Sequence, residues 1–312
     1  MISIIIPIFN SALFLERTYE SVLKQTHTDF EVIMVDDGST DHSAKICNIY
    51  AENDKRFRYF LKQNSGVADA RNLGLKKAKG SYISFLDSDD TYDPLFLEKL
   101  HNEIVNNNVA IAACNMYGIS KDKKKISSHF GLREKNVIMS DINFCLLQKF
   151  LGSASLCNKI YKREVFNNIK FPGGMLFEDN YVFHEIFGNS RYQISLIEDH
   201  LYYYHYNSES ITRKKFSLQR YDDHVSGLVR RKEFFLKEKK MYQAAAQTES
   251  MILDYMIINY LNNKEVQKNR LTIEYFLKNL LKSNVNYKTK IIIFSKLILN
   301  IDLFKSKFTP TK

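Results

Sequence analysis

Short apolar runs alternate with segments of helical spacing along the first hundred residues. Four runs rich in β-branched and aromatic residues predict buried strands over residues 2–8, 31–36, 57–62 and 81–87. The segments between them predict helices over residues 11–25, 39–53 and 66–80, the last one closed by Gly80 as a helix C-cap. Strand–helix alternation of this kind predicts an α/β fold with a mostly parallel sheet and helices on both faces.

The pattern becomes mixed after residue 100 and nearly all helical after residue 216. We expect strands over 110–118 and 192–206 and helices over 140–150 and 179–187. Charge and pattern both change near residue 213, which predicts a domain over residues 1–212, with halves 1–100 and 101–212, and a C-terminal helical region over 213–312.

Composition indicates an ordinary globular protein. The 312 residues are 45% hydrophobic and 26% charged, which allows a sizeable buried core. The four cysteines form no CxxC motif, so we expect neither a zinc cluster nor disulfides, but a reducing compartment. No charged segment precedes the first apolar run, and no apolar stretch approaches the roughly 20 residues that span a bilayer. We therefore expect a cytoplasmic protein.

The basic charge is concentrated in the last third of the chain. Residues 213–312 carry 21 Lys and Arg against 9 Asp and Glu, whereas residues 1–100 carry 12 against 15. A local excess of +12 predicts that this region contacts an anionic surface.

Carboxylates gather where the predicted strands end. Asp36 and Asp37 follow the second strand, and Asp87 and Asp89 follow the fourth. Ligands of parallel α/β sheets bind at this carboxyl edge. Side chains two residues apart on extended backbone point the same way, so Asp87 and Asp89 can converge on one ligand. Their oxygens suit Mg²⁺ or Mn²⁺.

Simpler interpretations exist for these acidic stretches. Residues 87–98 nearly match the spacing of an EF-hand calcium loop, but Tyr92 stands where that loop needs Gly, and Pro94 follows. The stretch could also be a solvated acidic loop with Pro94 opening a helix. Residues 35–41 could be a turn that caps a helix. Three polar strand ends on one edge favour a binding site instead: "IPIFN", "VDDGSTD" and "LDSDD".

Several ordered blocks resemble family 2 glycosyltransferases, which have the GT-A fold. These blocks are "SIIIPIFN", "SVLKQTHTDFEVIMVDDGSTD", "NSGVADARNLGLKKAKGSYISFLDSDD" and "FEDNYV". The blocks "CNKIYKREVF" and "YYYHYNSESIT" resemble the subgroup that builds bacterial capsule, exopolysaccharide and teichoic-acid glycans. The resemblance is close over residues 1–100 and looser to about 212, and it implies nothing specific for the remaining residues.

The resemblance implies a nucleotide site. Seven residues match the family's nucleotide-binding positions: Pro7, Phe9, Asn10, Asp36, Asp37, Arg71 and Asp87. The first three would lie by the base, Asp37 would accept a hydrogen bond from uracil, and Asp36 would support that loop. Arg71 would reach a base or phosphate oxygen, unless it is simply an exposed helix arginine. Asp87 would contact ribose or bound water.

The resemblance also implies a metal and a base. Asp89 would bind Mn²⁺ or Mg²⁺ at the diphosphate, and His205 would be a second metal or phosphate contact, unless it is a packed histidine in an aromatic run. Asp179 matches the family's general base, with Glu178 beside it; acids that only begin a helix are the simpler explanation.

An acceptor pair is implied as well. Asn158 and Lys159 match a family pair that often follows Trp, but Cys157 stands here, so a stacking contact with the acceptor is lost.

Together these matches imply an inverting, metal-dependent transfer from a UDP-sugar to a glycan or lipid-linked glycan. The alternatives are a glycoside hydrolase, whose hallmark is two carboxylates, and a catalytically silent nucleotide-sugar-binding protein. The hydrolase would need neither a site for a nucleotide base at the strand ends nor an Asp-x-Asp motif. Intact Asp37, Asp89 and Asp179 argue against a silent protein.

The basic tail has two interpretations. Residues 287–308 place apolar residues at helical spacing with lysines around them. Such a helix packs on the catalytic domain or on the partner of a homo-oligomer, or it lies on an anionic membrane surface. No nucleic-acid-binding motif accompanies the charge, so we expect no nucleic-acid partner.

Overall fold

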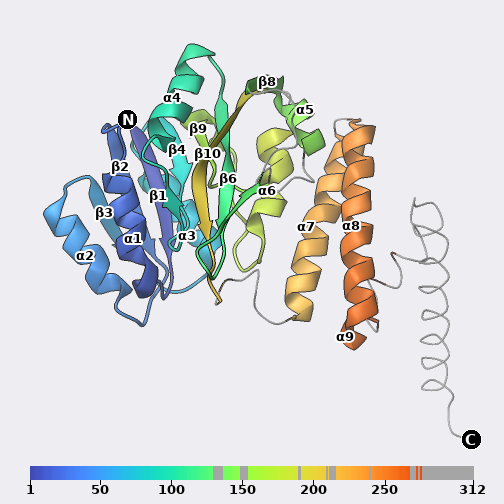
Figure 1. Cartoon of the computed structure of the whole chain (residues 1–312). Coiled ribbons are helices and arrows are strands. Elements are labelled where there is room, and N and C mark those ends of the chain that lie inside the picture. The colour runs from blue at the N-terminus through green and yellow to red at the C-terminus, as the bar shows by residue number, and fades with distance from the viewer. Residues whose placement is uncertain are drawn as a thin grey trace, which may run out of the picture. The chain divides into compact units, whose positions relative to one another are not determined.

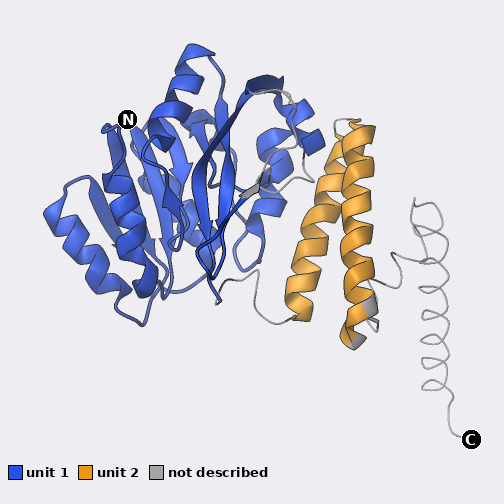
Figure 2. Cartoon of the chain, in the orientation of Figure 1, with its two compact units in different colours: residues 1–215 blue, residues 216–312 orange. Residues whose placement is uncertain are grey.

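The computed structural model describes residues 1–128, 136–147, 154–188, 191–208, 210, 216–238, 240–267, 272 and 275. The chain divides into two compact units, residues 1–215 and 216–312 (Figure 2). Among the described residues, no helix is long and apolar enough to cross a membrane.

Residues 2–85 contribute four parallel strands to one sheet (Figure 1). Its neighbouring strands pair in the order β3 (Phe57–Leu61), β2 (Phe30–Asp36), β1 (Ile2–Ile8) and β4 (Tyr82–Phe85). β1 and β2 are buried at every position, as expected when helices cover both faces. The connecting helices are α1 (Ala12–Leu23), α2 (Ser43–Asn53) and α3 (Val67–Lys77). The predicted alternation is therefore confirmed for this half.

Gly80 does not have the role that the sequence pattern predicts. Helix α3 ends at Lys77 and its C-cap is Ala78. Instead, Gly80 lies against β1, where an added Cβ atom would lie 2.7 Å from the Met1 carbonyl oxygen and 2.8 Å from the Ser3 nitrogen. A close approach of two backbones needs glycine here, so tertiary packing explains a residue that the local pattern attributed to a cap.

The second half of the first unit extends the sheet with mixed pairing. After β4 the order continues through β9 (Lys159–Lys162), β6 (Ile111–Ile119), β10 (Gln193–His205) and β5 (Thr91–Tyr92). β10 pairs in parallel with β6, whereas β9 is antiparallel to both β4 and β6. Two further strands lie off this path, β7 (Lys125–Ser128) beside β6 and β8 (Asn136–Ser140) beside β10.

The helices of this half are short except for α4 and α6. They are α4 (Phe96–Asn106), α5 (Asp141–Phe144), the 3₁₀ helices η1 (Cys145–Leu147) and η2 (Arg163–Phe166), and α6 (Glu178–Phe187). The predicted helix over 140–150 is thus two short turns up to residue 147, and its last residues lie outside the described part of the chain.

The second unit is helical in its described residues. It contains α7 (Leu218–Lys237), α8 (Tyr242–Asn262) and α9 (Lys264–Gln267). Buried side chains such as Tyr221, Leu228 and Ile252 form its own apolar core, so α7 and α8 pack as a pair. The predicted tail helix over 287–308 lies outside the described residues.

Candidate active site

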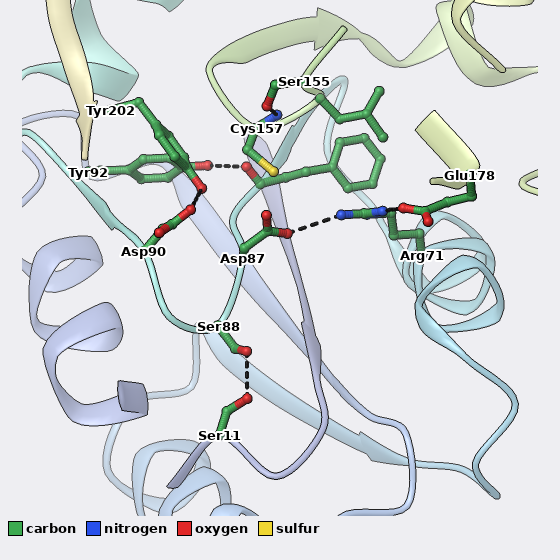
Figure 3. A network of polar contacts seen from close by, with 12 residues as sticks. Ser11, Arg71, Asp87, Ser88, Asp90, Tyr92, Ser155, Cys157, Glu178 and Tyr202 are labelled. Atoms are coloured by element: carbon green, nitrogen blue, oxygen red, sulfur yellow. Dashed lines mark hydrogen bonds and ion pairs between the residues drawn. The ribbon is translucent and has the colours of Figure 1, made fainter. Parts of the chain in front are cut away.

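The polar ends of β1, β2 and β4 meet at one edge of the sheet. The Asp37 backbone N–H donates to the Ile8 carbonyl at 2.8 Å, and the Leu86 N–H donates to the Ile5 carbonyl at 3.0 Å. The loops that follow are joined as well, because the hydroxyls of Ser11 and Ser88 share a hydrogen bond of 2.7 Å (Figure 3). The strand ends that the sequence singled out therefore form one surface.

Asp36 and Asn10 hold the loop after β2. The Asp36 carboxylate accepts hydrogen bonds from the Ser39 N–H and the Tyr59 hydroxyl, both at 2.8 Å. Asn10, with a φ of 49°, accepts one from the Thr40 N–H at 2.8 Å. Buried Asp36 thus fixes this loop from the protein interior. Phe9, the residue before Asn10, is 49% exposed. Pro7 lies within β1 and pairs with the Val35 position.

Asp37 is buried and already has three donors. Its carboxylate accepts hydrogen bonds from the Ser65 N–H at 2.9 Å, the Gly66 N–H at 2.7 Å and the Lys62 ammonium. These contacts fold the 62–66 loop around the carboxylate. The predicted contact between Asp37 and uracil stays a prediction, and any base would meet a carboxylate whose position is fixed beforehand.

Arg71 joins the two acidic motifs of the site. Its guanidinium donates to Asp87 Oδ1 at 3.0 Å and forms an ion pair with Glu178 (Figure 3). Arg71 is buried, so the idea of an exposed helix arginine is wrong. Burial by itself would lower the pKa of Arg71, but the charges of Asp87 and Asp179 raise it above its ordinary value. The first-half "LDSDD" and second-half "FED" blocks are therefore parts of one site.

Glu178 and Asp179 begin helix α6, in its first turn. Phe177, the residue before them, has left-handed backbone with φ 59°. The Asp179 carboxylate accepts a hydrogen bond from the Asn180 N–H at 2.8 Å. The two neighbouring acids differ in surroundings, because Glu178 faces Arg71 (Figure 3). The role of Asp179 as the base stays a prediction.

Asp89 and Asp90 differ strongly in their surroundings. Asp90 is fully buried and accepts hydrogen bonds from the Tyr202 hydroxyl at 2.6 Å and the His205 N–H at 2.8 Å. Asp89 accepts one from the Asn207 amide at 2.7 Å. Burial and then the charge of Asp87 raise the pKa of Asp89. Crowded acids of this kind fit a site whose negative charge is compensated by a cation.

The contacts of this stretch exclude an EF-hand. The segment before Asp87 is strand β4, and Tyr92 lies in strand β5. The Asp93 carbonyl, which would be the ligand at position seven of such a loop, instead accepts a hydrogen bond from the Gln25 amide at 2.7 Å. The solvated-loop interpretation is also wrong for Asp90, which is fully buried.

The residues present fit a hard divalent cation by their chemistry. Asp87 and Asp89 offer carboxylate oxygens, and His205 lies on β10 near the Asn207 that reaches Asp89. The Nε2 atom of His205 is 2.9 Å from the Thr91 hydroxyl, and burial lowers the pKa of this histidine to about 4. It is therefore neutral. Within the described ranges, no three His, Cys, Asp or Glu side chains are grouped to hold a metal by themselves.

Asn158 and Lys159 are fully buried. The Asn158 amide donates to the Cys114 carbonyl at 2.6 Å, and the Lys159 ammonium donates to the Ser155 carbonyl at 2.5 Å. Burial lowers the pKa of Lys159 to about 7. Both side chains shape the turn before β9. A direct contact with an acceptor sugar stays a prediction, and it would require this turn to move.

Sequence reasoning missed several residues of the site. Arg17 on α1 donates to the Asp89 carbonyl at 2.5 Å, and the Tyr202 hydroxyl supports Asp90. Asn207 could have been found, because it lies in the "YYYHYNSESIT" block. Arg17 carries no local signal, since only the tertiary fold brings α1 beside the loop after β4.

The sequence matches a known protein family and several known proteins. The sequence profile described as "Glycosyl transferase family 2" matches residues 3–170. The chain is 32% identical over 228 residues to glycosyltransferase GlyG of Streptococcus pneumoniae. This match covers 70% of this chain and 75% of GlyG. It is also 31% identical over 219 residues to the longer glycosyltransferase GlyA of the same species. This match covers 68% of this chain and 31% of GlyA.

A solved structure shares the fold. The structure of residues 1–349 of S. aureus TarS, determined in complex with UDP-GlcNAc, superposes with a TM-score of 0.65 at 21% identity. The match covers 95% of this chain and 80% of that one. The chain belongs to the family 2 glycosyltransferases and has their GT-A fold.

Proposed function

We propose that the protein transfers a sugar from a UDP-sugar, with inversion and with the help of a divalent metal, to a glycan or lipid-linked glycan of a bacterial cell surface. The observation that carries the proposal is the ion-pair chain Asp87–Arg71–Glu178. It links the donor-side acidic motif to helix α6, whose first turn contains Asp179. The UDP-GlcNAc named for TarS supports the choice of donor.

Asp179 is the proposed general base. Its carboxylate would take the proton from an acceptor hydroxyl while the oxygen forms a bond to the anomeric carbon of the donor. The bond between that carbon and the diphosphate breaks in the same step, and UDP leaves with the electron pair. One displacement gives a β-linked product from an α-linked donor. Glu178, held by Arg71, would keep the start of α6 in place.

Asp89 would hold Mn²⁺ or Mg²⁺, with His205 as a second candidate ligand. A bound cation supplies positive charge that stabilises the developing diphosphate. Neutral His205 has the protonation state that a metal ligand needs. Asp36 and Asp37 would present a fixed loop to the base, because their carboxylates are already held by backbone donors.

A donor screen tests this proposal. Purified protein is mixed with common UDP-sugars and acceptor glycans, with Mn²⁺ or with a chelator, and UDP release is measured. We expect metal-dependent release with one donor, and loss of that release in Asp89→Ala. Asp122→Ala is the matched control, since Asp122 is exposed in the turn between β6 and β7. Full turnover of the wild type in chelator would exclude the metal, and absence of release with every donor would favour a silent binding protein.

A further inference from the structure

The segment before Asp179 has a backbone that needs restraint. Residues 167–177 connect η2 to α6, and Gly174, in the 171–177 part of this connection, has φ +73°. Phe177, which ends the segment, has φ 59°, an unfavourable value for a residue with a bulky side chain. Such a backbone persists only where its surroundings determine it. The position of the first turn of α6, and of Asp179 in it, therefore depends on what holds this segment.

Helix α3 supplies two close contacts to the segment. The Asn72 amide donates to the Phe171 carbonyl at 2.8 Å, and the Phe171 N–H donates back to Asn72 Oδ1 at 3.0 Å. Further along, Gly173 lies so close to α3 that an added Cβ atom would be 3.0 Å from Asp69 Oδ2. Phe171 itself is fully buried, with its ring centroid 5.9 Å from that of Phe85. The start of the segment is thus fixed by an amide and by a packed ring.

The same helix holds the end of the segment. Arg71, the neighbour of Asn72, forms the ion pair with Glu178. Helix α3 therefore contacts the start, the middle and the end of residues 171–178. The donor-side half of the fold positions the loop that leads to the proposed base.

We propose that Asn72 is a positioning residue of the transfer reaction: its amide pairs with both backbone groups of Phe171 and so fixes the loop that carries Asp179. Only a side chain with a donor and an acceptor side by side can bond both the N–H and the C=O of one residue. An ionised Asp could accept from the N–H but could not donate to the C=O, and Ala could make neither hydrogen bond. This inference rests on the proposed function of Asp179, but Asn72 itself touches no substrate in it.

The expected effect follows from the sensitivity of catalysis to geometry. A base displaced by about 1 Å lowers the rate roughly a hundredfold. We expect Asn72→Ala to lower kcat by about tenfold to a hundredfold. The KM for the donor should stay within about twofold, because the loops that would hold the nucleotide keep their own hydrogen bonds. Asn72→Asp keeps the acceptor for the Phe171 N–H but sets a carboxylate oxygen against the Phe171 carbonyl, so its kcat should fall as well.

The experiment combines kinetics with amide hydrogen exchange of residues 171–178 in the folded protein. Lys76→Ala is the matched control, since Lys76 is exposed on the same helix. We expect faster exchange of the 171–178 segment and lower kcat in both Asn72 variants, and neither change in Lys76→Ala. Asn72→Asp serves if the Ala variant does not fold. Unchanged exchange, unchanged kcat, or a raised donor KM at normal kcat would each overturn the proposal.

A double variant separates this inference from the proposed function. If Asn72 acts through Asp179, then adding Asn72→Ala to Asp179→Asn should cost little further activity. A full additional loss would show that Asn72 acts elsewhere and would overturn the positioning role. If Asp179→Asn alone kept full turnover, the proposed base would be wrong, whatever the Asn72 variants do.

Discussion

Replacing Arg71 with Met tests how strongly the ion-pair chain holds the two acidic motifs together. The variant leaves the Glu178 side chain, which is 7% exposed, without its cation. A buried charge that loses its partner costs about 3–5 kcal/mol. The Asp87 side chain is 37% exposed and can be solvated, so the loss of its pair adds only about 0–1 kcal/mol. We expect the free energy of unfolding to fall by about 3–5 kcal/mol.

A second substitution, at Glu178, tests whether the unpaired charge causes the loss of stability. Glu178→Gln removes the stranded charge, and a neutral amide costs less to bury than an unpaired carboxylate. The double variant Arg71→Met, Glu178→Gln should therefore be more stable than Arg71→Met alone. Additive losses would mean that the two residues do not interact energetically.

Urea unfolding followed by far-UV circular dichroism measures both quantities, since the chain has no Trp. Arg163→Met, an exposed arginine of η2, is the control and should stay within about 0.5 kcal/mol of wild type. A loss below about 1 kcal/mol in Arg71→Met, or a double variant less stable than the single one, would refute the argument from burial.

Two further predictions concern Lys159 and the basic tail. Burial lowers the pKa of Lys159 from 10.5 to about 7, so between these values the unfolded chain binds more protons and stability rises with pH. Urea titrations should show that the free energy of unfolding of the wild type rises by about 2 kcal/mol between pH 7 and pH 9, relative to Lys159→Met. The same pH dependence of stability in both proteins would contradict the lowered pKa of Lys159. For the tail, we expect the full chain to co-sediment with anionic vesicles, less so at high salt, and deletion of 286–312 to reduce binding while short soluble acceptors are still used. If the full chain does not bind such vesicles at low salt, the membrane interpretation is wrong and the tail serves to pack on the catalytic domain or on a partner.

The strands were predictable because buried parallel strands are continuous apolar runs. Residues 31–36 were expected and Phe30–Asp36 observed, with the acids at the strand end as the pattern required. The topology of α/β sheets then places all such ends on one edge, so the meeting of these acids at that edge followed from the sequence.

The partners of the site residues were not predictable in the same way. Arg71 was expected to reach a nucleotide, but in the fold it pairs with Asp87 and Glu178. That pairing depends on how α3 packs against a loop from the other half of the domain, which no local pattern records. Gly80 was misassigned for a similar reason, since its small size serves a backbone contact with β1 and not a helix end.

The proposed role of Asp179 is tested most directly by comparing turnover with donor affinity in Asp179→Asn. A base acts on the acceptor hydroxyl and not on the diphosphate, so its loss should remove transfer without weakening donor binding. Calorimetric titration with the UDP-sugar found in the screen gives the affinity, and UDP release with acceptor gives the turnover. We expect residual turnover about 10²- to 10⁴-fold below wild type and a donor Kd within about twofold of wild type. Normal turnover, or a donor Kd raised in step with lost activity, would contradict it.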